Sequence, residues 1–211
     1  MLEDRLLLEN TKVRERNPGF DPERDWFSHA SWQYQCGLER HANIHLEADD
    51  PPNFLRSFLN QYAVDIMPGE YTFREHTTGG PPDKIYEESC FLERLRGMLV
   101  FETGGSLWLA RATPRSWLEE GKRIAVRSAP THFGRVSYEI TSDVDRGRIA
   151  ARVEMPSRER PSSVLLRLRH PRGAPMVGVS VDGRSSGDFD PKEETVRLGS
   201  GPGTITVEAR Y

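Results

Sequence analysis

The stretch 69–83 gathers the residue types that acid–base chemistry uses. In chain order its candidates are Glu70, Tyr71, Arg74, Glu75 and His76. A carboxylate that serves as a general base must be ionised and must lie within reach of a water molecule. Arg74 is adjacent to Glu75, so its positive charge either keeps that carboxylate ionised or is simply solvated. A surface connection with ordinary charges has the same composition, and this alternative stays open.

Two further groups contain residue types that bind ligands. His41 and His45 are four residues apart and would share one helical face, which is the spacing of paired metal ligands. No third ligand is evident nearby in the sequence, so we favour packing against an aromatic face and assign no metal and no cofactor. Trp32, Tyr34 and His41 carry rings that would either stack on a sugar or pack in a core.

The overall composition narrows the function classes. The 211 residues are 36% hydrophobic and 29% charged, and four Trp, nine Phe and six Tyr can form a core, which argues against disorder. The net charge of -3 gives no global basic field, so we expect no nucleic-acid partner. No apolar run approaches the roughly 18 residues of a membrane span, so we expect no membrane partner.

The cysteines and one run of arginines have ordinary structural explanations. Cys36 and Cys90 lie in helical patterns with apolar neighbours, which predicts two buried free thiols. Arg167, Arg169 and Arg172 alternate along one predicted strand. We interpret these arginines as a solvated face of the strand rather than as a nucleic-acid site.

The first residues lack the pattern of a signal peptide. Residues 1–8 include Glu3, Asp4 and Arg5, and no apolar core segment follows them. Residues 14–24 have no hydrophobic period and contain two prolines, which indicates a linker. We therefore expect the chain to begin in the middle of a longer polypeptide, and the sequence leaves its compartment open.

The composition changes near Thr113. Residues 1–113 carry 12 Lys and Arg against 19 Asp and Glu, a net charge of -7, whereas residues 114–211 carry 17 against 13, a net charge of +4. Fourteen of the 19 aromatic residues lie in the first part. These differences predict two structural units. The predicted boundaries are a linker-like segment at 1–27, a helical segment at 28–97 and a β-sandwich at 98–211.

The first part has helical periodicity. A helix is predicted over about 28–47, and Asp50 is expected to cap a second helix that has Pro51 at its first position. The apolar stripe of this second helix consists of Phe54, Leu55, Phe58, Leu59, Tyr62 and Ile66. A polar loop over 69–82 follows, and Asp83 is expected to cap a third helix. The first two helices would form an antiparallel helical hairpin.

The second part has short strands separated by turns. Gly104 and Gly105 predict a hairpin between 98–102 and 107–110, and residues 114–120 a single helical turn. Later strands are predicted at 124–127, 134–142, 148–155, 164–170, 176–181, 195–198 and 203–209. Their spacing of about ten residues is typical of an antiparallel sandwich. The predicted fold class is therefore α+β, with an N-terminal helical hairpin segment followed by a C-terminal antiparallel β-sandwich.

The order of these elements resembles the C-terminal end of bacterial glycoside hydrolases that have a six-hairpin (α/α) barrel, of the α-L-rhamnosidase type. The matching stretches are 71–76 (YTFREH), 87–100 (EESCFLERLRGMLV), 106–118 (SLWLARATPRSWL) and 124–140 (IAVRSAPTHFGRVSYEI). The last hairpins and the sandwich would account for nearly all of the chain. The helical segment would then be a remnant of the barrel, and the missing N-terminal barrel portion of the same polypeptide would be its partner.

The resemblance also implies roles for individual residues. In rhamnosidase-type enzymes a Thr-x-aromatic-Glu stretch late in the barrel supplies the general base, and 72–75 is similar to it, although Phe73 comes one place early. This implies that Glu75 is the catalytic base, with Glu70 as second candidate, in the hydrolysis of a glycosidic bond by two carboxyl groups. The implied carbohydrate-binding residues are Trp32, Tyr71, Arg74 and His76. The general acid lies earlier in the family's barrel, so the isolated chain is expected to be inactive.

A second interpretation is a stand-alone, non-catalytic module, a sandwich with helical cover that binds a glycan or a protein. This interpretation predicts that Trp32, Phe54, Phe58 and Tyr62 are buried within the chain. The fragment interpretation instead predicts an exposed apolar face on the helices at 28–66.

Overall fold

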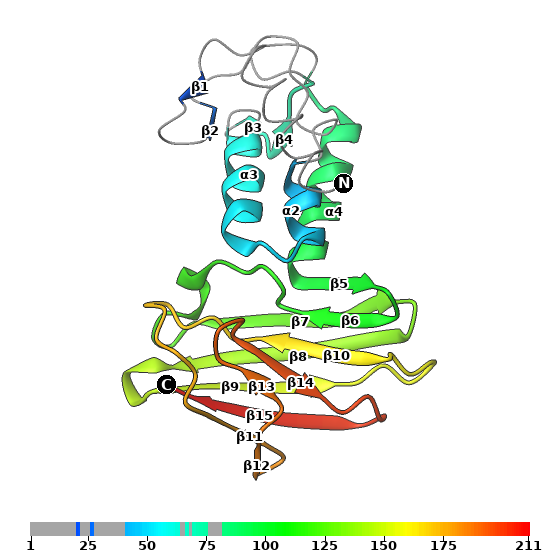
Figure 1. Ribbon diagram of the computed structural model, residues 1–211. Helices are drawn as coiled ribbons and strands as arrows, with labels where there is room; N and C mark the ends of the chain where they lie inside the picture. Colours follow the sequence, from blue (N-terminus) through cyan, green and yellow to red (C-terminus); the bar gives the residue numbers. More distant parts are fainter. Residues whose placement is uncertain (1–19, 22–25, 28–40, 64–65, 68, 76–81) are drawn as a thin grey trace. The chain divides into compact units, whose positions relative to one another are not determined.

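The chain forms two compact units, Met1–Arg96 and Gly97–Tyr211. The computed structural model in Figure 1 describes residues 20–21, 26–27, 41–63, 66–67, 69–75 and 82–211. Within this described part, no helix is both long and apolar enough to cross a membrane. The fold is mixed α+β, with few helices and mostly antiparallel sheets.

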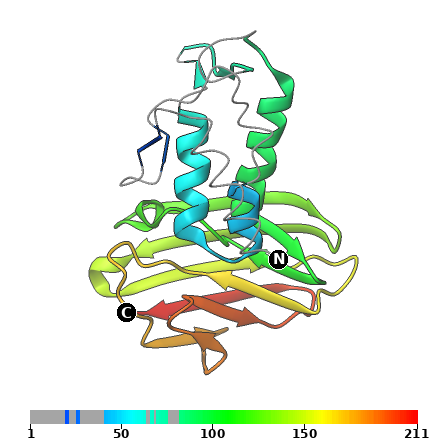
Figure 2. The ribbon, with the colours of Figure 1, turned by 45° about the horizontal axis from the view of Figure 1, so that its top comes forward.

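The described part of the first unit contains two helices and most of a third. Helices α2 (His41–Glu47), α3 (Pro51–Ala63) and α4 (Ile85–Leu99) lie side by side in both views (Figures 1 and 2). Asp50 Oδ1 accepts a hydrogen bond from the amide of Asn53 at 3.2 Å, which confirms the predicted cap of α3. The predicted first helix is described only from residue 41, and its remainder lies outside the described residues.

Two short hairpins lie beside or between the helices. Strand β1 (Phe20–Asp21) pairs with β2 (Trp26–Phe27) in the segment predicted as a linker. Strand β3 (Ile66–Met67) pairs with β4 (Thr72–Phe73). The prediction that the helical stripe reaches Ile66 is therefore wrong. The carbonyl of Lys84 accepts the amides of Glu87 and Glu88, so Lys84 rather than Asp83 occupies the capping position of α4.

An aromatic cluster fills the space between α3, β4 and α4. Its rings are those of Phe54, Phe58, Tyr62, Phe73 and Phe91, and neighbouring ring centroids are 5.0–5.6 Å apart. Such pairs add about 0.5–1.5 kcal/mol each beyond the area that they bury. Cys90 is also buried and free, as predicted, whereas Cys36 lies outside the described residues.

A buried arginine joins the three helices. Arg94 on α4 has no exposed surface. Its Nε donates to Asn43 Oδ1 on α2 at 2.9 Å, and its Nη1 donates to the hydroxyl of Tyr62 on α3 at 2.7 Å. The helical period puts Arg94 on the same face as Cys90 and Met98, so the charge enters the core together with apolar neighbours.

The second unit is built from two β-sheets. Its strands are β5 (Val100–Thr103), β6 (Ser106–Leu109), β7 (Arg123–Thr131), β8 (Gly134–Asp143), β9 (Arg148–Glu154), β10 (Ser163–Arg167), β11 (Gly178–Val181), β12 (Arg184–Ser186), β13 (Phe189–Asp190), β14 (Thr195–Leu198) and β15 (Thr204–Arg210). The five-stranded sheet has the order β13-β14-β10-β6-β5, and the six-stranded sheet has the order β12-β11-β15-β9-β8-β7 (Figure 1). Strands β6 and β10 are parallel, which departs from the predicted all-antiparallel pattern.

The two sheets share one apolar core, which gives a sandwich-like arrangement. Inward residues of both sheets belong to it, such as Leu107 and Val164 from one sheet and Ile140 and Val207 from the other. Each predicted strand from residue 98 onward has a counterpart, whereas β12 and β13 were not predicted. Gly104 and Gly105 form the predicted turn with φ values of 55° and 82°.

We predict that Arg94→Met destabilises the helical unit by about 2–3 kcal/mol, because the Tyr62 hydroxyl and the Asn43 amide oxygen lose a charged partner inside the core. Urea unfolding followed by circular dichroism at helical wavelengths measures this change. The matched control is Arg96→Met, at an exposed position of the same helix. Equal losses in the two variants would contradict the role assigned to Arg94.

Candidate functional site

Glu75 follows strand β4 and is held by a lysine from the approach to α4. The ammonium Nζ of Lys84 forms an ion pair with Oε1 of Glu75, whose side chain is 20% exposed. The amide of Lys84 also donates to the carbonyl of Phe73 at 3.2 Å. The backbone bond and the ion pair together connect the two ends of the loop that carries Glu75. The sequence analysis did not identify Lys84 as a partner of Glu75.

The neighbours of Glu75 on the hairpin have different environments. Thr72 is buried, and its hydroxyl donates to Oε1 of Glu88 at 2.6 Å, which ties β4 to α4. Tyr71 is 92% exposed and has a left-handed φ of 56°. Glu70 and Arg74 are exposed as well. Trp32 and His76, the other two predicted site residues, lie outside the described residues.

This arrangement gives Glu75 a defined position. A charge-assisted hydrogen bond from an ammonium is stronger than a neutral one. Lys84 therefore supplies a compensating positive charge for the Glu75 carboxylate. The sequence analysis considered Arg74 for this role, with a solvated Arg74 as the alternative. A general base in this loop would act on a water molecule while its other oxygen contacts Lys84.

His45 has an acidic neighbour. Its Nδ1 lies 3.4 Å from Oδ2 of Asp50, the residue that caps α3. Over the described ranges, no three or more His, Cys, Asp and Glu side chains gather as a metal site requires. The side chain of His41 is outside the described part of the structure.

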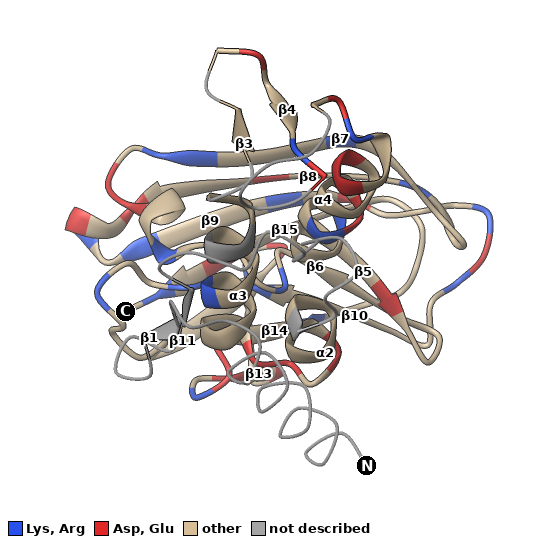
Figure 3. Cartoon of the chain, turned by 90° about the horizontal axis from the view of Figure 1, so that it is seen from above, with Lys and Arg blue, Asp and Glu red and all other residues tan. Residues whose placement is uncertain are grey.

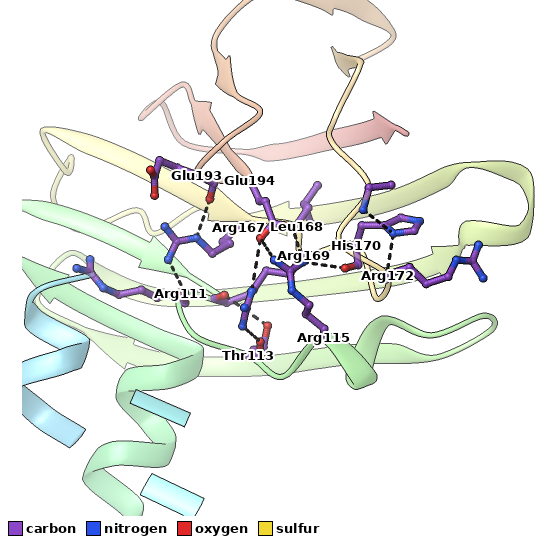
Figure 4. A network of polar contacts seen from close by, with 12 residues as sticks. Arg111, Thr113, Arg115, Arg167, Leu168, Arg169, His170, Arg172, Glu193 and Glu194 are labelled. Atoms are coloured by element: carbon purple, nitrogen blue, oxygen red, sulfur yellow. Dashed lines mark hydrogen bonds and ion pairs between the residues drawn. The ribbon is translucent and has the colours of Figure 1, made fainter. Parts of the chain in front are cut away.

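Two of the three arginines predicted to form a solvated face are buried, so the prediction is wrong for these two. Arg167 is 2% exposed and Arg169 is 5% exposed, whereas Arg172 is exposed. Backbone carbonyls replace water around the buried groups (Figure 4). Nε of Arg167 donates to the carbonyl of Glu193 at 3.0 Å, and its Nη1 donates to the carbonyl of Arg111 at 2.7 Å. Nη1 of Arg169 donates to the carbonyl of Thr113 at 2.9 Å.

Glu194 is the acid of this arginine cluster. Arg115 donates to both of its carboxylate oxygens, at 2.6 and 2.8 Å, and Nε of Arg169 lies 3.6 Å from one of them. Burial lowers the pKa of Arg169 to about 10, and the positive charge of Arg115 adds to this effect. Donors of Arg115, Arg167 and Arg169 bind backbone carbonyls and Glu194, so the cluster fastens segments of the sandwich together (Figure 4).

Aromatic rings complete the environment of the cluster. The guanidinium carbon of Arg111 lies 4.3 Å from the ring centroid of Trp108 and 4.7 Å from that of Phe101. Such cation–π contacts contribute up to about 2 kcal/mol when they are desolvated. The hydroxyl of Tyr211 donates to the carbonyl of Leu168 at 2.8 Å, and burial raises the pKa of Tyr211.

His170 is buried at the end of the cluster as a hydrogen-bond acceptor. Its Nδ1 accepts the amides of Arg172 at 3.2 Å and Ala174 at 3.3 Å, which requires that nitrogen to carry no proton. Burial, followed by the charges of Arg172 and Arg115, lowers the pKa of His170. The unfolded chain therefore takes up this proton at a higher pH than the folded chain does.

We predict that the stability contributed by neutral His170 is fully present above about pH 6.5 and is lost as the pH falls from there towards the folded pKa. His170→Asn keeps an acceptor and removes the titration. Urea midpoints measured between pH 7.5 and pH 5 should fall less in this variant than in the unmodified chain. The same pH dependence in both proteins would exclude His170 as the cause.

Comparisons with known proteins add little to this geometry. No protein-family model matches the sequence, and no curated protein matches it. A solved structure described as a glycoside hydrolase resembles the chain with a TM-score of 0.42 and 9% sequence identity. The match covers 81% of this chain and 31% of the solved chain, so this chain spans about a third of that protein's length. The chain fits a glycosidase-like fold only loosely.

Proposed function

We propose that the chain is the C-terminal part of a carbohydrate-active glycoside hydrolase of the six-hairpin, α-L-rhamnosidase type. Residues 28–97 then belong to the end of the helical barrel, and residues 98–211 form an accessory β-sandwich. The substrate is a carbohydrate. The partner of the helical segment is the N-terminal barrel portion of the same polypeptide.

The observation that carries this proposal is the position of Glu75 within the order of elements. The β3–β4 hairpin lies between α3 and α4, and the two sheets follow α4 directly. The sequence resemblance assigns the general base to this hairpin. Glu75 is also half-buried and paired with Lys84, whereas Glu70 on the same hairpin is exposed. A fixed carboxylate meets the requirement for positioned acid–base catalysis better than a solvated one.

Hydrolysis would then use carboxyl groups from two parts of the polypeptide. Glu75 takes a proton from the attacking water, and a carboxylic acid of the barrel portion protonates the leaving oxygen of the glycosidic bond. Tyr71 and Arg74 would contact the sugar from the exposed side of the hairpin, together with Trp32 and His76. The isolated chain lacks the acid and is inactive in this proposal.

A stand-alone binding module is the second candidate function, and the burial of three aromatic rings is compatible with it. Phe54, Phe58 and Tyr62 are buried within the chain, as that interpretation expects, and Leu59 and Ile66 are exposed. This burial does not separate the two candidates. A group of three helices buries such rings between its members, whether or not further helices pack around it.

We predict that the 211-residue chain alone hydrolyses no aryl glycoside, whereas the polypeptide that includes the barrel portion does. In that longer protein, Glu75→Gln should lower kcat by about 10²–10⁴-fold, because general-base catalysis is lost, with little change in KM. Steady-state kinetics with an aryl glycoside measures both constants.

Glu93→Gln is the matched control, since Glu93 is an exposed carboxylate on α4 that accepts a hydrogen bond from Asn43. The same substitution at Glu70 tests the second candidate base. A Glu75→Gln enzyme with normal kcat would remove Glu75 from catalysis. Turnover by the isolated chain would show that the acid is not missing.

A further inference from the structure

Two adjoining hollows lie on the outer face of the six-stranded sheet. Their volumes are about 360 Å³ and about 390 Å³, which fall in the range of small-ligand sites. Glu139 and Arg152 line both hollows, so the two adjoin at this pair of side chains, and together we call them the outer groove. The lining of the outer groove includes Ala125, Arg127, Glu139, Ala150, Arg152 and Thr206.

Short side chains and a bulge shape the outer groove. Ala125 on β7, Ala150 on β9 and Ser180 on β11 line it and leave room above the sheet. Strand β7 has a register shift between Val126 and Ala129, which is a bulge that bends the strand beside the groove. The base of the outer groove is therefore formed by the backbone and by the small side chains of the sheet.

A row of polar side chains crosses the middle of the outer groove. Glu139 on β8 is the register partner of Arg152 on β9, and Arg152 is in turn the partner of Thr206 on β15. Such neighbours have Cβ atoms about 4.5–5.5 Å apart. The hydroxyl of Thr206 is oriented by a 3.1 Å hydrogen bond to Asp182. The row therefore presents the two carboxylate oxygens of Glu139, the five N–H donors of the Arg152 guanidinium group and the hydroxyl of Thr206 side by side.

The ion pairs of this row are long and solvated. Arg152 lies 4.0 Å from Glu154, and Glu139 lies 3.5 Å from Arg123. The side chains of Arg152 and Glu139 are 62% and 43% exposed. Exposed pairs of this kind contribute about 0–1 kcal/mol. A ligand that offers shorter hydrogen bonds can replace them at little cost.

The charges of the outer groove favour a neutral ligand. Its lining contains two arginines, Arg127 and Arg152, and three glutamates, Glu139, Glu154 and Glu208. Figure 3 shows charged residues of both signs on strands β7, β8 and β9. Because opposite charges alternate, the groove has no strong field of one sign to attract a phosphate or a polyanion.

The geometry of the sheet also favours a hydroxyl-rich ligand over a peptide. Strands β8, β9, β15 and β11 each pair with a strand on both sides, so the backbone groups beneath the row are occupied, and β7 is the edge strand of the sheet. A peptide adds a strand only at a sheet edge, and the alanines of the groove offer no deep apolar pocket. Hydroxyl groups both donate and accept, and so they match alternating carboxylate, guanidinium and hydroxyl groups.

We propose that the outer groove binds a neutral oligosaccharide through the row Glu139, Arg152 and Thr206. The choice of a saccharide among hydroxyl-rich ligands rests on the proposed function. The site itself lies on the sandwich and is separate in sequence from the Glu75 hairpin. The proposal therefore predicts that this chain binds the oligosaccharide without hydrolysing it.

The test is calorimetric titration of the whole 211-residue chain with neutral gluco-, xylo-, manno- and rhamno-oligosaccharides. We expect binding to at least one of these probes. Arg152→Ala should lower the association constant about tenfold or more, because it removes hydrogen bonds from a charged donor. Arg184→Ala is the matched control, since Arg184 is an exposed arginine on β12 outside the groove lining, and it should bind normally. Thr206→Val provides a second, milder variant if Arg152→Ala unfolds.

Three results would overturn the proposal. The first is that none of the four probes binds. The second is that the Arg152→Ala and Arg184→Ala chains have equal affinity and Thr206→Val is also unchanged. The third is that inorganic phosphate, polygalacturonate or an extended peptide binds more tightly than the neutral probes. These outcomes are distinct from a failure of the proposed hydrolase, because the Glu75→Gln kinetics do not depend on the groove. Binding of a probe by a chain that carries Glu75→Gln would support the groove proposal independently of the proposed hydrolase.

Discussion

A buried guanidinium group needs acceptors for its N–H donors, and both compact units are organised around this constraint. In the sandwich, Arg167 and Arg169 reach the carbonyls of Arg111, Thr113 and Glu193. These contacts join the segment after β6 to the end of β10 and to the residues before β14. In the helical unit Arg94 joins α2 and α3 through Asn43 and Tyr62. Removal of one partner in such a set leaves buried groups unsatisfied, which costs more than the net contribution of the bond itself.

This constraint distinguishes the residues that hold the fold together from the exposed residues that a ligand can contact. Donors of Arg115, Arg167 and Arg169 bind backbone carbonyls and Glu194 within the sandwich, so the cluster is part of the framework. On the six-stranded sheet, the ion pairs of exposed Glu139 and Arg152 are long, and these side chains are the ones that a ligand can recruit. In the helical unit the corresponding distinction is between buried Thr72, which bonds to α4, and the exposed hairpin residues Glu70, Tyr71 and Arg74.

Local patterns predicted the elements well, and long-range contacts explain the errors. Period-2 alternation and turn residues located the strands of the sandwich, and strand β14 has the predicted bounds. The same alternation placed Arg167 and Arg169 in solvent, because it contains no information on which distant segment covers a strand. The parallel pairing of β6 with β10 also depends on residues far apart in sequence. The ion pair of Glu75 with Lys84 joins two residues that no periodic pattern of the sequence relates. Residue types alone identified the stretch 69–83 as the candidate site, and the role of Glu75 as catalytic base comes from the resemblance.

Whether residues 28–97 belong to a larger helical barrel is tested most directly by sequencing the DNA immediately upstream of the Met1 codon. We predict a continuous reading frame that encodes further helical hairpins and the missing general acid. A stop codon close upstream would contradict the assignment of this chain to a glycoside hydrolase. Binding of a glycan or a protein would then be the leading function.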